Sequence, residues 1–193
     1  MSKKVSIVFH SVCGNTYLMA KEFYNEFKNC NADVQLLRIN DPNYDELAKQ
    51  FSVAGQYKNE IVKTDEAVVD KLLDSDIILL GSPTYFGNVS GAMKAFMDSF
   101  APHWTNAAFW GKKLFSFTTC GTTEGGAEMC LNAINIFGQH MGMTTVPVPS
   151  NLISNQNYPA YGLTHYVGDY SNIRPSREVI LAIKEMTDRL LSL

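Results

Sequence analysis

The sequence lacks several features that would point to particular classes of protein. It has 16 basic and 19 acidic residues, a net charge of −3, so it lacks the basic surplus of a protein that binds the nucleic-acid backbone. It also contains no apolar run approaching the 18 or so residues of a membrane span. We therefore expect neither nucleic acid nor a membrane as a partner.

Cysteine is scarce and its spacing is uninformative. The four cysteines form no CxxC pair and no zinc-type pattern; they are Cys13, Cys30, Cys120 and Cys130. The N-terminal apolar run, Val5–Phe9, is too short for the core of a signal peptide. We expect reduced thiols, no metal site and a cytoplasmic location.

The remaining composition is ordinary for a globular chain. Apolar residues make up 46% and charged residues 18% of the 193 residues, which fits one domain spanning 1–193. Strand-like segments alternate with segments of helical periodicity. The expected strands are Val5–Phe9, Val34–Ile39, Ile77–Leu80, Lys113–Thr118 and Thr144–Val148. The expected helices are Asn15–Phe27, Gly91–Phe100, Ala127–Met141 and a last one that starts at Pro175-Ser176.

This alternation predicts an α/β fold with helices on both faces of a parallel sheet. Five strands suit the flavodoxin-like, doubly wound order 2-1-3-4-5, a three-layer α/β/α arrangement whose ligand lies at the carboxyl ends of the strands. Two connections, Asn40–Thr64 and Ser150–Arg174, are long. Such long loops are typical of functional covers or interface segments.

The first loop at the predicted ligand edge is Ser11–Thr16. It places hydroxyls, the Asn15 amide and the flexible Gly14 at the start of a helix, where free N–H groups and the helix dipole favour a phosphate. The loop has neither a Walker lysine nor GxGxxG, so a monophosphate such as that of FMN is the expected occupant. An ordinary helix cap remains the alternative.

The second loop follows the third strand and runs from Gly81 to Gly91. It has three glycines, a proline and two adjacent aromatics, Tyr85 and Phe86. Rigid turns would hold backbone groups against a planar ring, and the aromatics would flank the ring or wall it from water. A turn-rich connection with locally packed aromatics remains the alternative.

The third loop, Thr118–Gly126, follows the fourth strand and is rich in glycine and hydroxyl side chains. Backbone can approach a ligand closely here, and the N–H groups of Cys120, Gly121 and Thr122 would meet the polar edge of the ring. A flexible surface loop is the alternative. The convergence of three small, polar loops at one sheet edge is more specific than any one of them.

With these loops placed, the chain resembles the flavodoxin-like NAD(P)H:quinone oxidoreductases of the WrbA type over nearly its whole length. The most specific element is Pro83–Gly91, close to that family's PTRFGNxSGQ. Trp104 matches a tryptophan over the flavin, and His140–Met143 resembles the HHGM whose first histidine lies near the ring. Tyr161-Gly162 and Arg174-Pro175-Ser176 echo the PYG and RQPS elements.

The resemblance implies an FMN-dependent enzyme that takes two electrons from NAD(P)H and passes them to a quinone-like acceptor. The flavin would perform the chemistry, with no dedicated catalytic side chain and with His140 and Trp104 at the acceptor site. It also implies a homodimer or homotetramer with sites built from more than one subunit. The residues expected to bind FMN are Ser11, Cys13, Gly14, Asn15, Thr16, Pro83, Thr84, Tyr85, Phe86, Gly87, Asn88, Thr119, Cys120, Gly121, Thr122 and His140.

The chain departs from the family at several positions. Tyr85 replaces an arginine and removes a cation from the mouth of the site, and Cys13 stands where a tyrosine beside the nicotinamide is common. The third loop carries an extra Thr-Glu. We expect Cys13 to be a lining residue and Trp110 to belong to the core or an interface.

Three other functions remain open at this point. A flavodoxin-type electron carrier would share the fold, but carriers are typically shorter and more acidic around the flavin. A reductase of FMN, nitro or azo compounds would differ only in pocket shape. A regulatory protein could keep the fold without turnover.

Overall fold

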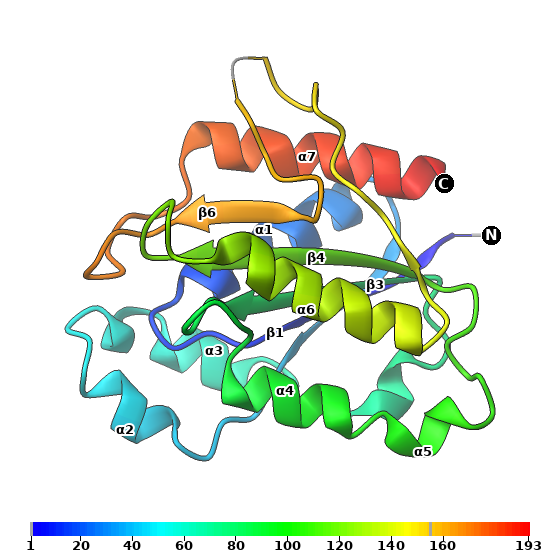
Figure 1. Cartoon of the computed structure of the whole chain (residues 1–193), viewed down its shortest axis with the longest axis horizontal. Helices are drawn as coiled ribbons and strands as arrows, with labels where there is room; N and C mark the ends of the chain where they lie inside the picture. The colour runs from blue at the N-terminus through cyan, green and yellow to red at the C-terminus, as the bar shows by residue number, and fades with distance from the viewer. Residues whose placement is uncertain (1, 155) are drawn as a thin grey trace.

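The computed structural model describes residues 2–154 and 156–193. Within these residues the strands form one sheet, and helices connect them along the chain (Figure 1). The strands are β1 (Lys4–Phe9), β2 (Asp33–Arg38), β3 (Ile77–Pro83), β4 (Lys113–Cys120), β5 (Thr144–Thr145) and β6 (Leu163–Tyr166). The helices are α1 (Asn15–Asn29), α2 (Tyr44–Ala48), α3 (Lys58–Lys63), α4 (Gly91–Asp98), α5 (Ala101–Trp104), α6 (Ala127–His140) and α7 (Arg177–Ser192). Two short 3₁₀ turns are η1 (Ala54–Gln56) and η2 (Val69–Leu72).

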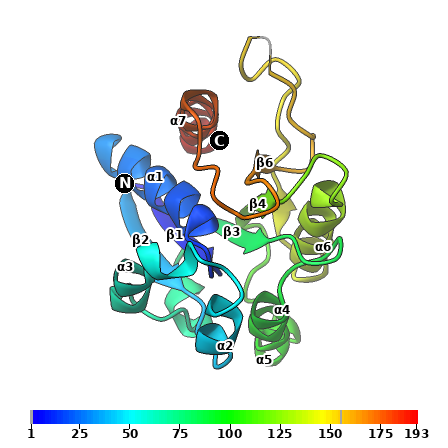
Figure 2. The same cartoon turned by 90° about the vertical axis from the view of Figure 1, so that its left-hand side faces the viewer.

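The sheet is parallel and has the order β2-β1-β3-β4-β5, so the predicted doubly wound topology is confirmed. Alternate residues of β1 enter opposite layers, as a strand buried on both faces requires. Ile7 and Phe9 pack with α1 and α7, whereas Val8 packs with α4 and α6. Figure 2 shows these helix pairs on opposite sides of the sheet.

The fifth position of the sheet differs from the prediction. The expected strand Thr144–Val148 pairs with β4 only at Thr144–Thr145, because Pro147 has no N–H to continue the ladder. Further along, β6 pairs with Phe117–Cys120 of β4. This strand lies in the segment expected to be the loop Ser150–Arg174, of which Asn155 is outside the described residues.

The predicted loop Asn40–Thr64 is also partly helical, since it contains α2, η1 and α3. The main helices match the prediction. In α4, Met93, Phe96 and Met97 are buried, and the Ser90 hydroxyl caps its first turn by accepting a hydrogen bond from the Met93 N–H at 3.2 Å. The Ser176 hydroxyl likewise caps α7 through the Val179 N–H.

No helix in the described part of the chain is long and apolar enough to cross a membrane. Four cysteines carry free thiols: Cys13, Cys30, Cys120 and Cys130.

The junction of β3 and β4 gives a direct test of core packing. A Cβ added at Gly81 would overlap the ring of Phe117, which is fully buried on the neighbouring strand. We expect Gly81→Ala to lower the free energy of unfolding by about 1–3 kcal/mol, measured by urea denaturation.

The matched control is Gly55→Ala, because a Cβ there meets nothing within 4 Å. Its free energy of unfolding should stay within roughly 0.5 kcal/mol of the wild-type value. Equal losses for the two variants would contradict this account of the β3–β4 contact.

Candidate functional site

A small cavity of about 60 Å³ opens at the carboxyl ends of β1, β3 and β4, where all three predicted loops converge. Parallel strands that end at one edge bring their following loops together, so distant segments of sequence share one wall. The cavity is lined by Ser11, Val12, Cys13, Asn15, Thr16, Phe51, Pro83, Thr84, Tyr85, Thr119, Gly121, Val167 and Ser171.

The loop between β1 and α1 forms a cradle of backbone donors. Gly14 is left-handed, with φ +92°, and its N–H donates to the Ser11 hydroxyl at 3.2 Å. Within the described residues, the N–H groups of Cys13, Asn15 and Thr16 have no acceptor. The first N–H groups of a helix have no intrahelical partner, so this cradle presents several donors to an anion.

Hydroxyl contacts tie the three loops to one another. The Thr16 and Thr119 hydroxyls are 2.8 Å apart and joined by a hydrogen bond. The Thr84 N–H donates to the Thr119 carbonyl at 2.8 Å, and its hydroxyl bonds that of Thr118 at the same distance. The site is therefore braced by the protein, with its loops in fixed relative positions.

The second loop makes a two-residue turn between Tyr85 and Asn88. The backbones of these residues exchange two hydrogen bonds of 2.9 and 3.0 Å. Phe86 and Gly87 both have positive φ, +52° and +73°, as a type I′ turn requires. This conformation is unfavourable for phenylalanine, and the Phe86 side chain is fully exposed, at 108% of its reference area.

The two aromatics of this loop thus have different environments. Tyr85 lines the cavity, and burial raises the pKa of its phenol, with a smaller contribution from nearby acidic groups. The phenol stays protonated at neutral pH and can donate a hydrogen bond. The Phe86 ring, in contrast, projects away from its own chain and lines no part of the cavity.

In the third loop, Gly121 lines the cavity and Cys120 lies buried beneath it. A Cβ at Gly125 would lie 2.5 Å from the Cys120 sulfur, so glycine permits this close packing. Thr122 is exposed and does not line the cavity. In the described structure, the N–H of Gly121 has no acceptor and is available to a ligand.

Four lining residues were missed by the sequence prediction: Val12, Phe51, Val167 and Ser171. Val12 belongs to the predicted loop, but Phe51 precedes η1, and Val167 and Ser171 follow β6. The Ser171 carbonyl accepts from the Asn15 side-chain amide at 2.8 Å. No motif marked Phe51, Val167 or Ser171, and the docking of two long connections brings these three to the cavity.

The structure places Trp104 and His140 away from this cavity. The Trp104 indole N–H donates to the His140 carbonyl at 3.0 Å, so the two lie together. They lie at the far end of α6, whose 14 residues span about 20 Å. Figure 1 shows α5 and this end of α6 on the side away from the strand tips.

Within one chain His140 does not line the cavity, so its contact with the flavin stays a prediction. The reason is topological: a helix that follows a strand runs back toward the start of the sheet, so its last residue leaves the ligand edge. Trp104 and Trp110 are both exposed, at 60% and 78%. Trp110, expected in the core or an interface, is outside the core of this chain, and its place at an interface stays a prediction.

Cys13 is a half-buried lining residue. Burial raises the pKa of its thiol, while a hydrogen bond from Ser171 and the charge of Arg174 act in the opposite direction with smaller effect. The thiol is therefore neutral at physiological pH. In the described residues, no group of three His, Cys, Asp or Glu side chains is placed to hold a metal ion.

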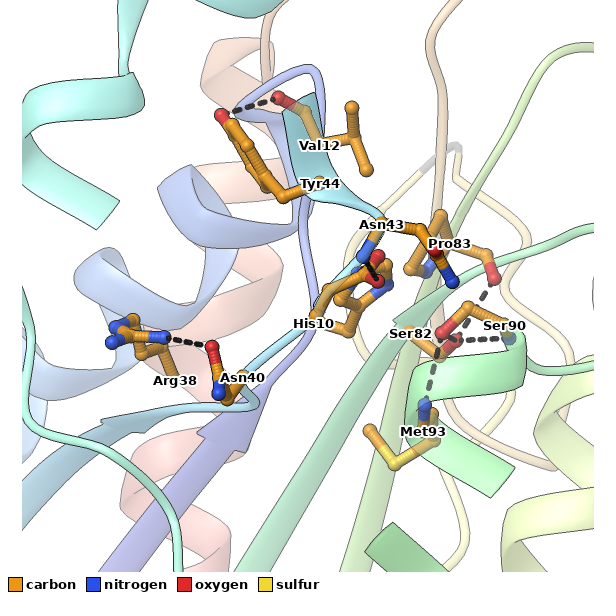
Figure 3. Close-up of polar contacts among 11 residues, drawn as sticks. His10, Val12, Arg38, Asn40, Asn43, Tyr44, Ser82, Pro83, Ser90 and Met93 are labelled. Carbon is orange, nitrogen blue, oxygen red and sulfur yellow. Dashed lines mark hydrogen bonds and ion pairs between the residues drawn. The ribbon is translucent and has the colours of Figure 1, made fainter. Parts of the chain in front are cut away.

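A buried polar pair joins the end of β1 to the connection after β2. His10 follows β1 directly, and its Nε2 lies 2.9 Å from an Asp41 carboxylate oxygen, with both side chains almost fully buried. The other Asp41 oxygen accepts from the Asn43 N–H at 2.9 Å. Figure 3 shows His10 next to Asn43, with Tyr44 donating to the Val12 carbonyl.

Comparison with known proteins agrees with this architecture. Residues 6–157 match the family described as NADPH-dependent FMN reductase, and the chain belongs to that family. An NAD(P)H dehydrogenase (quinone) of Syntrophobacter fumaroxidans is 31% identical over 147 residues, covering 76% of this chain and 72% of that protein. Another of that name, from Methanosarcina barkeri, is 26% identical over 183 residues and covers 90% and 88%.

Solved structures show the same fold at lower identity. A WrbA-like flavodoxin from Agrobacterium tumefaciens aligns with a TM-score of 0.64 at 18% identity, covering 99% of this chain and 96% of that chain. Flavodoxin 2 from Bacillus cereus gives 0.65 at 17%, with 98% of each chain covered. At this level of identity the likeness concerns the fold alone.

The Asp41 contacts predict a pH dependence of stability. The hydrogen bond from His10 lowers the pKa of Asp41 below its usual value, so the carboxylate stabilises the folded state at pH values above about 4. This contribution is lost as the pH falls through the folded-state pKa. We expect Asp41→Asn to lower the free energy of unfolding at pH 7 by about 1–3 kcal/mol and to flatten its decline on acidification.

The measurement is urea denaturation of both proteins at several pH values between about 7 and 2, a range that spans the titration of carboxyl groups. Asp65→Asn removes an exposed carboxylate as the control and should leave the pH profile of the wild type intact. A parallel profile for wild type and Asp41→Asn would disprove the stabilising role of the pair.

Proposed function

We propose that this protein is an FMN-dependent oxidoreductase that transfers two electrons from NAD(P)H to a quinone-like acceptor. The observation that carries the proposal is the braced cavity, in which free N–H groups at the start of α1 face two turns that suit a planar ring. Membership of the NADPH-dependent FMN reductase family supports it. So do the relatives named NAD(P)H dehydrogenase (quinone).

The residues of the cradle fit a phosphate monoester. We assign the phosphate to Ser11, Cys13, Gly14, Asn15 and Thr16, through backbone N–H groups and the hydroxyls of Ser11 and Thr16. The Asn15 side chain orders the loop, because both ends of its amide are bonded within the protein. Direct contact with the phosphate therefore falls to its backbone N–H.

The ring is assigned to the second and third loops, in particular to Pro83, Thr84, Tyr85, Thr119 and Gly121, which line the cavity. Gly87, Asn88, Cys120 and Thr122 would shape these turns, and the Gly121 N–H would meet the polar edge of the ring. When bound, the flavin supplies hydride acceptance and two-electron donation. Tyr85 and Cys13 give the site a neutral wall at physiological pH.

The first test is turnover. Purified protein reconstituted with FMN should consume NADPH or NADH beyond one equivalent per flavin only when benzoquinone is present. The reaction is followed by the absorbance of the reduced nicotinamide under anaerobic conditions. Nitro and azo compounds in parallel reactions identify the preferred acceptor class. Failure of both nucleotides with every acceptor would overturn the proposal.

A matched pair of glycine variants links turnover to the cradle. A Cβ at Gly14 would overlap the Tyr57 ring in a left-handed conformation that favours glycine, so Gly14→Ala should retain less flavin and lose activity in proportion. Gly91→Ala meets nothing within 4 Å and serves as the control.

A flavodoxin-type carrier is the competing function for this fold. Its hallmark would be two well-separated one-electron steps in a potentiometric titration of the bound flavin. We expect a single two-electron step here, because a reductase of this class delivers electrons in pairs.

We propose the cytoplasm as the location of this protein, because a reducing compartment suits its four free thiols.

We further propose a homodimer or homotetramer in which a partner subunit completes the site. Exposed apolar side chains lie on α6 at Met129 and Ile136, on the second loop at Phe86, and at Trp104 and Trp110. A two-fold assembly would repeat these residues on both subunits. It would offer a route for Trp104 and His140 of one subunit to approach the cavity of the other.

Light scattering should then give a mass two or four times the 21.5 kDa of one chain. Trp104→Ala should lower kcat/KM for the quinone by about tenfold, or roughly 1.4 kcal/mol, without changing FMN affinity. Leu181→Ala, an exposed residue of α7, is the control. A fully active monomer would exclude the shared site.

A further inference from the structure

Arg174 connects three distant segments behind the first loop. It lies just before α7, and one guanidinium nitrogen, Nη1, donates to the Cys13 carbonyl at 2.9 Å and to Asn15 Oδ1 at 3.0 Å. The other, Nη2, donates to Gln56 Oε1 at 2.6 Å. The guanidinium carbon also lies 5.0 Å from the centre of the Tyr57 ring.

These contacts act on the atoms that define the cradle. The Cys13 carbonyl and the Gly14 N–H belong to one planar, trans peptide unit, so they point in opposite directions. When the carbonyl is bonded to Arg174, the N–H is directed to the Ser11 hydroxyl, which accepts it. The carbonyl of Cys13 is thereby turned away from an anion in the cradle.

The Arg174 guanidinium also lies over the ring of Tyr57. Tyr57 packs on the Cα of Gly14 so closely that no Cβ would fit. The Arg174 guanidinium lies over the same ring and donates to the neighbouring Gln56. One side chain thus couples the conformation of the first loop to the connection after β2 and to the segment after β6.

The charge of Arg174 has no carboxylate partner in the described structure. All four of its hydrogen-bond acceptors are neutral oxygens, including the Ser171 carbonyl at 3.4 Å. A guanidinium stays protonated in proteins, so a positive charge remains uncompensated behind the cradle. Its influence on the pKa values of both Cys13 and His165 indicates the reach of this field.

We propose that Arg174 is a positioning residue that holds the first loop in its anion-binding shape and offsets the charge of a bound phosphate dianion from behind. The inference rests on the proposed binding of FMN. It assigns to Arg174 an effect on the phosphate but not on the ring, which distinguishes it from a general structural role.

The test compares FMN with riboflavin, which has the same ring without the phosphate. Dissociation constants are measured for the apoprotein by quenching of flavin fluorescence. Wild type should bind FMN more tightly than riboflavin. Arg174→Gln should weaken FMN binding by roughly 10- to 100-fold, within the range for charge-assisted hydrogen bonds, and leave riboflavin affinity within about twofold.

Arg174→Lys keeps the charge without the forked geometry, so its FMN affinity should lie between those of wild type and Arg174→Gln. This variant also tests the inference if Arg174→Gln does not fold. Arg177→Gln, an exposed arginine in the first turn of α7, is the control and should match wild type. Equal losses of FMN and riboflavin affinity, or an unchanged FMN-to-riboflavin ratio, would overturn the inference. Wild type that binds neither flavin would overturn the proposed function itself.

Discussion

The structure depends on one constraint, the left-handed conformation of Gly14 at the start of α1. With φ at +92°, the chain leaves β1, reverses and enters the helix with several N–H groups still free of acceptors in the described structure. Unpaired donors in a protein interior are unfavourable unless a partner is supplied. The cradle is therefore most stable when an anion occupies it, which makes ligand binding and local folding parts of the same equilibrium.

The surroundings of the cradle reduce its freedom in complementary ways. His10 and Asp41 fix the end of β1 below it, Thr16 bonds Thr119 across the neighbouring loop, and Arg174 holds it from behind. Each contact joins segments more than 30 residues apart in the sequence. A site braced on several sides has less conformational entropy to lose on binding, which suits a cofactor that stays bound through turnover.

Phe86 is the exception to this ordered arrangement. The Tyr85 and Cys13 side chains line the site and are neutral, because burial raises the pKa values of the phenol and the thiol and keeps both protonated. Phe86 instead combines an unfavourable positive φ with a fully exposed ring. Strain of this kind persists where the surrounding turn enforces it and where the side chain serves contacts beyond its own chain. The proposed partner subunit would give the exposed ring such contacts.

The sequence by itself determined the order of the sheet, the main helices and the three loops at its ligand edge, because strand and helix periodicities are local and glycine-rich turns follow each strand. Tertiary structure decided the rest. β6 was missed because four residues among Tyr, Gly and Pro carry too short a pattern to mark a strand. Phe51 and Ser171 line the cavity, and Arg174 contacts the first loop, because long connections dock there. His140 is separated from the cavity because of the direction in which α6 runs. Docking and direction are set by packing between distant segments, which leaves no periodic trace in the chain.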